Sequence, residues 1–289
     1  MVQRWGRVAV MVGVTTWAIG NLIVRDTELQ GPRLALWRYI IAAVLYTGWH
    51  LWRVGPLSLS QARIAAPAAV AITLEIALFF TAIQRTTVAN VTVIGSLVPL
   101  LLAGIAVRRY GERIPPAVVV AAMIGLAGVA AVVYGSTAAV GWSFGGDMLA
   151  VIALLFFAAY FVLGKEARRS LAAISLQTYT MLLGVPVLAA VCLLTIGTVA
   201  PPPADQWVYP MGLVALPTTG HLLVNWAHQH VTLTFTSLMT LAVPVLSAVG
   251  AWLAFSEALT TMQVAGMAVV LTVLAFVVVE GERGRFRTS

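Results

Sequence analysis

Residues 82–112 read AIQRTTVANVTVIGSLVPLLLAGIAVRRYGE, and residues 227–257 read AHQHVTLTFTSLMTLAVPVLSAVGAWLAFSE. At a fixed offset of 145 residues, nine of the 31 aligned positions are identical. The identical residues include Gln, Thr, Pro and Glu, which unrelated apolar segments would not keep in step. A duplicated apolar unit with a proline inside it is typical of membrane transporters that are built from two structural repeats.

The composition is that of an integral membrane protein. Hydrophobic residues make up 61% of the chain and charged residues 9%, against about 45–50% and about 25% in ordinary soluble domains. The net charge of +7 therefore indicates charge asymmetry across a membrane, and no nucleic-acid partner is expected. Cys192 is the only cysteine, which excludes an internal disulfide and a thiolate metal cluster. We expect no cofactor and no metal.

The pattern of apolar runs predicts an all-α fold with ten transmembrane helices, since each span needs about 20 apolar residues. The first run ends in Arg25, Asp26 and Glu28 rather than in small residues, so we interpret it as a span and not as a cleaved signal peptide. The predicted spans are 6–24, 34–52, 64–83, 88–107, 115–134, 147–164, 171–196, 210–228, 233–252 and 261–279.

Positive charges predict the orientation. With the N-terminus in the cytoplasm, 13 of the 17 Lys and Arg residues lie on the cytoplasmic side, as the positive-inside rule requires. Both termini are then cytoplasmic, and residues 281–289 form a basic cytoplasmic tail. Residues 1–135 and 146–280 form two five-helix repeats. Because five is odd, the second repeat is inverted, and inverted repeats place a substrate site near the midplane between them. We expect one transport domain and a monomer.

The chain resembles the drug/metabolite transporter superfamily, and each half resembles an EamA domain. The resemblance rests on the recurring pattern A-x-Q-x-x-T, V-P and a closing Glu, and on WAIGN at 17–21, RY at 38–39 and GGDMLA at 145–150. It implies a secondary transporter in the bacterial inner membrane that exports a small metabolite, with amino acids, including aromatic or neutral ones, as the expected substrates. An exporter of drugs or cationic compounds is the alternative within this fold. The second-half spans contain no Lys or Arg to hold a phosphate, which argues against an anionic substrate.

Glu75 is the outlying residue, because it lies near the middle of the third predicted span. An ionisable side chain at that depth costs about 2.5–3.5 kcal/mol on the milder insertion scales. One interpretation is a carboxylate that carries protons, binds a substrate ammonium, or does both in turn. The other is a carboxyl group that only holds helices together through an Arg or a hydroxyl. Its counterpart in the second repeat is Gly220.

His221 and Asn225 lie four residues apart in the eighth predicted span and therefore share a helix face. A histidine titrates near neutral pH, and an asparagine both donates and accepts hydrogen bonds. The pair could bind a substrate carboxylate or amide, with His221 relaying protons, or it could only form hydrogen bonds between helices. Across the repeat axis, this face is expected to look toward the span of Glu75.

Aromatic residues inside the spans could line the same site. Such rings stack on apolar or aromatic groups and attract ammonium groups; plain packing is the alternative for each. Asn21 lies one turn from Trp17, on the same face of the first span. The candidate rings are Trp17, Phe79, Tyr160 and Trp226.

Pro99 and Pro244 occupy matching positions and should kink their helices. They are either hinges for alternating access or fixed kinks.

Arg38, near the outer end of its span, should either reach the headgroups or pair with Asp26 or Glu28 as an outer gate. Three carboxylates beside short loops are expected to cap the helices that follow: Glu112, Asp147 and Glu257.

Two other functional classes remain as rivals. An intramembrane enzyme would need more than one Glu and one His on separate helices, and the chain has no HExxH or G-x-S-x-G motif. A channel usually uses rings of polar residues from several copies, whereas an internal duplication favours alternating access by one chain. A nucleotide-driven pump is excluded because the chain has no Walker loop.

Overall fold

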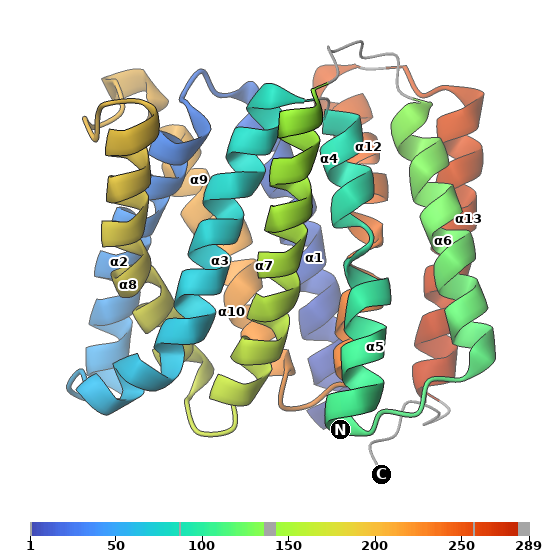
Figure 1. Ribbon diagram of the computed structural model, residues 1–289, viewed down its shortest axis with the longest axis horizontal. Helices are drawn as coiled ribbons and strands as arrows, with labels where there is room; N and C mark the ends of the chain where they lie inside the picture. Colours follow the sequence, from blue (N-terminus) through green and yellow to red (C-terminus); the bar gives the residue numbers. More distant parts are fainter. Residues whose placement is uncertain (1, 87, 136–142, 257, 283–289) are drawn as a thin grey trace.

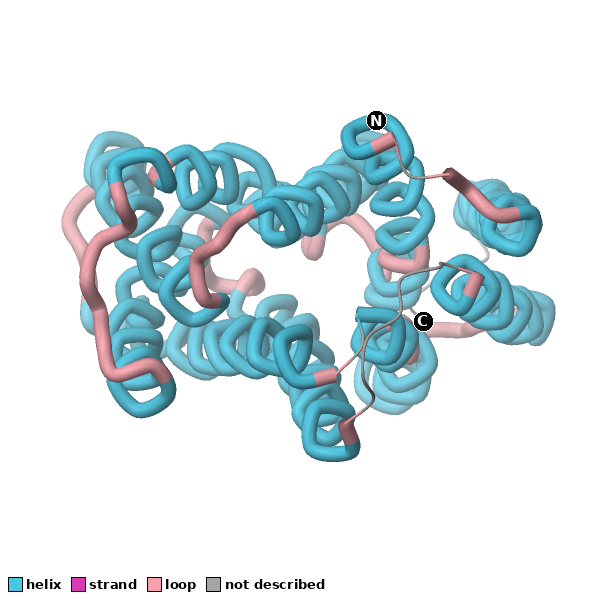
Figure 2. The backbone as a smooth tube through the Cα atoms, turned by 90° about the horizontal axis from the view of Figure 1, so that it is seen from above, coloured by secondary structure: helices cyan, strands magenta, loops and turns pink. Residues whose placement is uncertain are grey.

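The computed structural model describes residues 2–86, 88–135, 143–256 and 258–282. The described elements are helices that lie side by side and run from one face of the molecule to the other (Figures 1 and 2). They are α1 (Val2–Asp26), α2 (Gly31–Arg53), α3 (Leu59–Arg85), α4 (Val88–Gly95), α5 (Val98–Tyr110), α6 (Pro116–Tyr134), α7 (Phe144–Ala167), α8 (Ala173–Thr195), η1 (Ala204–Gln206), α9 (Val208–Leu213), η2 (Val214–Thr218), α10 (Thr219–Ala227), α11 (Leu233–Met239), α12 (Ala242–Phe255) and α13 (Thr261–Glu282).

These helices make the ten predicted crossings, because α4 with α5, α9 with α10, and α11 with α12 each form one broken crossing. Eight crossings are long and apolar enough to span a membrane by length and composition. The other two are α2, which carries three arginines, and α9–α10, which a π-helical turn interrupts. The start of α1 and the end of α13 lie at the same face, the lower one in Figure 1.

The breaks in α4–α5 and α11–α12 fall just before Pro99 and Pro244. A proline cannot donate to the carbonyl four residues earlier, and its ring clashes with that carbonyl. The chain instead tightens into a short turn, in which Leu97 N donates to Ile94 O at 3.0 Å and Leu241 N donates to Leu238 O at 3.1 Å. The matching prolines thus break both helices at equivalent points.

The two halves of the chain share their cores. One core cluster is built from α2, α3 and α5 of the first half together with α7 and α8 of the second. The other combines α1 and α6 with α10 to α13. The contacts between helices follow the symmetry of the repeat. The contact of α3 with α7 is equivalent to the contact of α10 with α1. In addition, α2 packs on its counterpart α8, and α6 packs on its counterpart α13. Because neither half has a core of its own, the halves form one structural unit.

The outer surface is apolar, as a lipid-facing surface must be. Large hydrophobic side chains project from the peripheral helices, among them Val44, Leu45, Val120, Met123, Leu253 and Leu271. A shallow groove of about 490 Å³ between α3 and α7 belongs to this surface, since its lining is apolar apart from Arg63. It is separate from the polar residues described below.

Glu112 caps a helix, but in the other half of the chain rather than the next element. Its buried carboxylate accepts hydrogen bonds from Leu233 N at 2.8 Å, Thr234 N at 3.1 Å and Thr234 Oγ1 at 2.6 Å, at the start of α11. Asp147 was expected to cap as well, but Ser143 caps α7, and Asp147 accepts from Thr86 Oγ1 at 2.7 Å. Glu257 lies outside the described residues.

Candidate functional site

Glu75 lies on α3, where that helix packs against α7 and α8 of the other half. Its side chain is only half-buried, although helices surround it. Within the described part of the chain, no hydrogen bond or ion pair holds its carboxylate. The cation that acts on it electrostatically is Arg38. A carboxylate that only tied helices together would have a partner, and the described residues provide none.

Arg38 does not lie where we expected it. It neither reaches the headgroups nor pairs with Asp26 or Glu28, because its side chain is 4% exposed and Nε donates to Thr218 Oγ1 at 2.8 Å. Thr218 closes the π-helical turn η2, in which its hydroxyl donates to Leu213 O at 2.9 Å. The signal that was available in the sequence was Pro217, which interrupts the helix beside Thr218.

Trp17, Tyr160 and His221 come together from α1, α7 and α10. The imidazole centroid lies 4.7 Å from the Trp17 ring and 5.9 Å from the Tyr160 ring. Phe157, which the sequence analysis did not single out, lies edge-on to Trp17 at 6.1 Å. Gly220 allows this approach, since a Cβ there would lie 3.0 Å from Trp17 Nε1 and would overlap Thr16 Oγ1.

Asn225 serves a buried hydrogen-bond chain between three helices. Its Oδ1 accepts from Tyr160 OH at 2.9 Å, and its Nδ2 donates to Gln177 Oε1 at 3.1 Å. The residue is fully buried, and its amide is engaged on both sides. The structure thus agrees with the second of the two interpretations, hydrogen bonding between helices. This bond fixes the Tyr160 ring beside His221.

Two of the sequence-predicted residues, Asn21 and Trp226, lie away from this group. Asn21 donates to Ser247 Oγ at 3.2 Å at the contact of α1 with α12. Phe79 packs against two core clusters, the one that includes Tyr160 and the one formed where α3, α4 and α7 meet. The Trp226 ring lies 4.5 Å from the ring of His230.

Several buried polar atoms around Glu75 and His221 have no hydrogen-bond partner among the described residues. An unpaired buried donor costs about 1–3 kcal/mol, so a cluster of them indicates a place where a polar ligand or water binds. The charge of Arg38 acts on Glu75, Tyr160 and His221, which places these groups in one electrostatic environment. The unpaired atoms are Trp17 Nε1, Arg38 Nη2 and His221 Nδ1.

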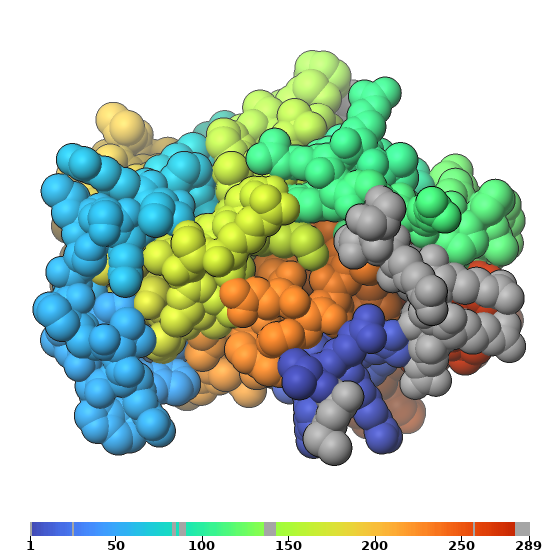
Figure 3. Space-filling model, turned by 90° about the horizontal axis from the view of Figure 1, so that it is seen from below, coloured from blue at the N-terminus to red at the C-terminus, as the bar shows by residue number. Residues whose placement is uncertain are grey.

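The lower face of the molecule is closed by contacts between α7 and α10. Arg168, which is 3% exposed, donates from Nε to Asn225 O and from Nη2 to Gln229 Oε1, both at 2.8 Å, and from Nη1 to Leu171 O. Burial lowers the pKa of Arg168 to about 10, so it remains charged at neutral pH. Figure 3 shows the end of α7 and the turn after α10 filling the middle of this face.

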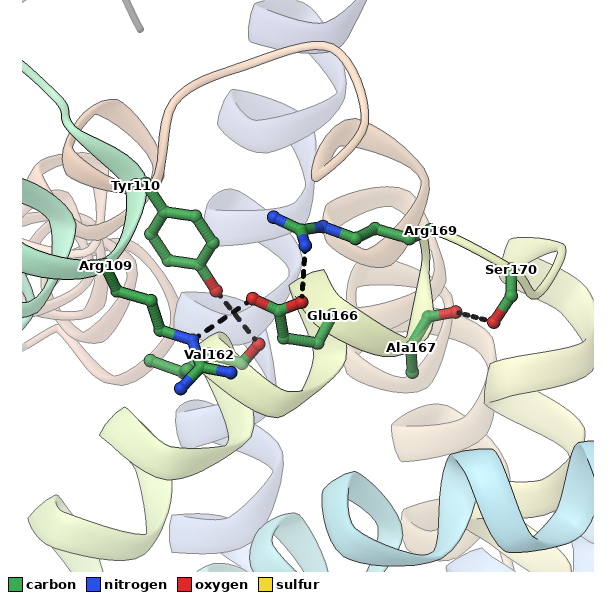
Figure 4. A network of polar contacts seen from close by, with 7 residues as sticks. All are labelled: Arg109, Tyr110, Val162, Glu166, Ala167, Arg169 and Ser170. Atoms are coloured by element: carbon green, nitrogen blue, oxygen red, sulfur yellow. Dashed lines mark hydrogen bonds and ion pairs between the residues drawn. The ribbon is translucent and has the colours of Figure 1, made fainter.

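A second set of contacts joins α5 to the same end of α7 (Figure 4). Glu166 accepts from Arg109 Nε at 3.2 Å and pairs with Arg169 at 3.0 Å. Both arginines are well exposed, and exposed pairs contribute only about 0–1 kcal/mol. The buried contacts of Arg168 therefore contribute more to the closure than these exposed pairs. Lys165 adds two hydrogen bonds at the same place, from Nζ to His228 O at 3.2 Å and to Val231 O at 3.0 Å.

Replacing Arg168 with Gln should open this face locally. The substitution removes the donors to Asn225 O and Leu171 O, and hydrogen exchange of residues 228–232 should accelerate at least about tenfold, since local opening governs exchange. The matched control is Arg169→Gln, which removes one exposed ion pair and should leave the exchange rate unchanged. Equal acceleration in both variants would show that Arg168 has no special part in the closure.

The described residues contain no group of three or more His, Cys, Asp or Glu side chains that could hold a metal ion. The features that stand out are instead an unpartnered carboxylate, a buried arginine and the adjoining rings of Trp17, His221 and Tyr160 at the contact between two related halves. That arrangement is suited to binding a small molecule between the halves of a transporter.

Comparison with known proteins identifies the family. The sequence pattern of the EamA-like transporter family matches residues 4–134 and again residues 144–279, one match for each half. None of the curated proteins matches the chain significantly. A solved crystal structure, described only as that of a protein, is 18% identical over 98% of both chains, with a TM-score of 0.79; at that identity it shows the fold alone. The chain is a multi-pass membrane protein and a secondary transporter of small molecules, not an enzyme, and it belongs to the EamA-like transporter family.

Proposed function

We propose that this transporter moves amino acids, including aromatic or neutral ones, out of the cell across the bacterial inner membrane by alternating access. One observation carries the proposal: the half-buried Glu75 carboxylate, on a helix that packs against α7 and α8, has no hydrogen-bond or ion-pair partner in the described chain. A substrate ammonium would supply that partner. The rings of Trp17 and Tyr160 would offer stacking and cation–π contacts beside it.

Protons are the coupling ions in this proposal. Glu75 would take up a proton when the substrate leaves and release it when the next ammonium binds. His221 is the second candidate for proton transfer, because its Nδ1 is buried without a partner and its ring contacts Trp17 and Tyr160. The charged or titratable groups that act on Glu75 or His221 are Arg38, Tyr39 and Tyr160.

Alternating access is supported by the closure of one face and by the paired helix breaks. Arg168 closes the face that the positive-inside rule places in the cytoplasm, so the described state would be closed on that side. The breaks before Pro99 and Pro244 lie at equivalent points of the two halves. In this proposal, they let α5 and α12 tilt relative to α4 and α11 when the face opens.

Export of organic cations is the second candidate, because a carboxylate beside aromatic rings also suits a cation without a carboxylate. The buried charge of Arg38 counts against it, since an arginine close to Glu75 repels a purely cationic substrate.

Uptake into proteoliposomes distinguishes the two. A panel of labelled amino acids and organic cations should be offered with and without a pH gradient. Saturable, gradient-driven uptake of amino acids, with little uptake of cations, is the expected result. Uptake of cations alone would favour the second candidate, and uptake of neither class would contradict both assignments of substrate.

A further inference from the structure

The geometry points to Arg38 as the subsite for a substrate carboxylate, opposite Glu75, so that the two residues together select a zwitterion. This inference rests on the proposed function and deepens it, because it assigns the half of the amino acid that Glu75 cannot bind. Arg38 stood outside the sequence-based site, and its burial beside Glu75 emerged only from the packing of α2 against α8 and the π-helical turn.

The first argument is the unmet hydrogen-bonding capacity of Arg38. A guanidinium carries five N–H donors, and in the described chain only Nε is used, to Thr218 Oγ1 at 2.8 Å. Nη2 is buried with no partner. Thr218 is neutral, so the bond does not compensate the charge. Buried charges are ordinarily paired, because taking an unpaired charge out of water is very costly.

The second argument is the relation of Arg38 to Glu75. The two charges interact electrostatically, yet no ion pair joins them. If Arg38 existed only to neutralise Glu75, a direct pair would form, because the attraction within a pair offsets most of the free-energy cost of desolvating both groups. Two opposite charges that attract each other without forming an ion pair instead match the two ends of an amino acid, whose ammonium would bind Glu75 and whose carboxylate would bind Arg38.

The third argument is the shape of the guanidinium. Its planar fork matches a carboxylate with two parallel hydrogen bonds, and such bidentate pairs are among the strongest in proteins. Nε is held by Thr218, which fixes the plane of the fork and leaves the two terminal nitrogens for a ligand. Trp17, Tyr160 and His221 then flank the side chain of the substrate.

The test compares binding of L-phenylalanine with binding of the same molecule without its carboxylate (2-phenylethylamine) and without its ammonium (3-phenylpropanoate). L-leucine and 3-methylbutylamine form a second pair for a smaller side chain. Titration of the purified full chain gives a Kd for each. The wild type should bind the amino acid at least about tenfold more tightly than the amine. Arg38→Gln should remove that difference by weakening binding of the amino acid, while the amine should bind no more weakly than it does to the wild type.

Arg38→Lys keeps the charge but not the fork, and it should retain part of the preference. It also supplies the result if the Gln variant fails to fold. Equal loss of amino-acid and amine binding in Arg38→Gln would show that Arg38 is structural. The same result in Arg38→Lys would show this if only that variant folds. Equal binding of both ligands by the wild type would show that the substrate carboxylate makes no contact with Arg38. Either result overturns the inference while gradient-driven amino-acid uptake still stands. A wild type that neither binds nor transports amino acids would overturn the proposed function and this inference together.

Discussion

Replacing Glu75 with Gln should abolish the response of transport to a pH gradient while leaving the protein folded. Gln has nearly the same shape but cannot lose a proton or attract an ammonium group. Loss of a hydrogen bond to a charged group corresponds to about 10- to 150-fold in affinity, and we expect kcat/KM for the driven substrate to fall in that range or further. Uptake in proteoliposomes at matched and opposed pH measures both effects.

Stability separates this role from a structural one. Because no described residue forms a hydrogen bond or ion pair with Glu75, Glu75→Gln loses only the attraction to Arg38, while a neutral side chain is easier to place in the membrane interior. The midpoint of thermal unfolding should therefore change little. The matched control is Glu166→Gln, whose exposed pairs with Arg109 and Arg169 lie outside the site and whose transport should remain driven. Driven transport that survives in Glu75→Gln would contradict proton coupling by this residue.

Replacing Glu112 with Ala should cause the largest loss of stability among single changes away from the site. Its carboxylate is 2% exposed and accepts three hydrogen bonds from the first residues of α11. Each donor left buried and unpaired costs about 1–3 kcal/mol, so we expect the free energy of unfolding to fall by about 3 kcal/mol or more. Reversible unfolding in mixed detergent micelles measures the difference.

The control for Glu112 is Glu166→Ala, which removes a carboxylate at the same end of the bundle. Glu166 pairs with two exposed arginines, so its loss should cost about 0–1 kcal/mol. The free energy of unfolding of Glu112→Gln should lie between those of the wild type and Glu112→Ala. The oxygen of the Gln amide can still accept hydrogen bonds, but the amide nitrogen cannot. Similar losses for Glu112→Ala and Glu166→Ala would contradict a special role for the buried cap.

The helices and their order could be predicted from the sequence because membrane spans are a local property. Without water in the bilayer, each segment must satisfy its backbone groups by itself, and the apolar run reports this directly. The same holds for Pro99 and Pro244, since the lost N–H and the ring clash act within one turn of helix. These prolines are where the structure breaks α4–α5 and α11–α12.

The partners of the polar side chains could not be predicted in this way, because they lie far away in the chain. Glu112 was expected to cap a helix and does so, but the helix begins 121 residues later. Arg38 looked like a residue at the membrane surface, and only the packing of α2 against α8 and the π-helical turn buries it against Thr218. Trp226 lies on the same helix as His221, yet its ring lies against His230.

Composition, charge and the repeated segment were thus sufficient to predict a ten-span membrane protein made of two related halves, because hydropathy and duplication are properties of the sequence itself. They also singled out Glu75, because a charged residue within an apolar run can be recognised without knowing which residues it contacts. Which groups face that charge depended on the tertiary structure. Arg38 and Tyr160 interact with it electrostatically from α2 and α7, and His221 lies against Tyr160 from α10. Helices so distant in sequence meet only through the interlocking of the two halves.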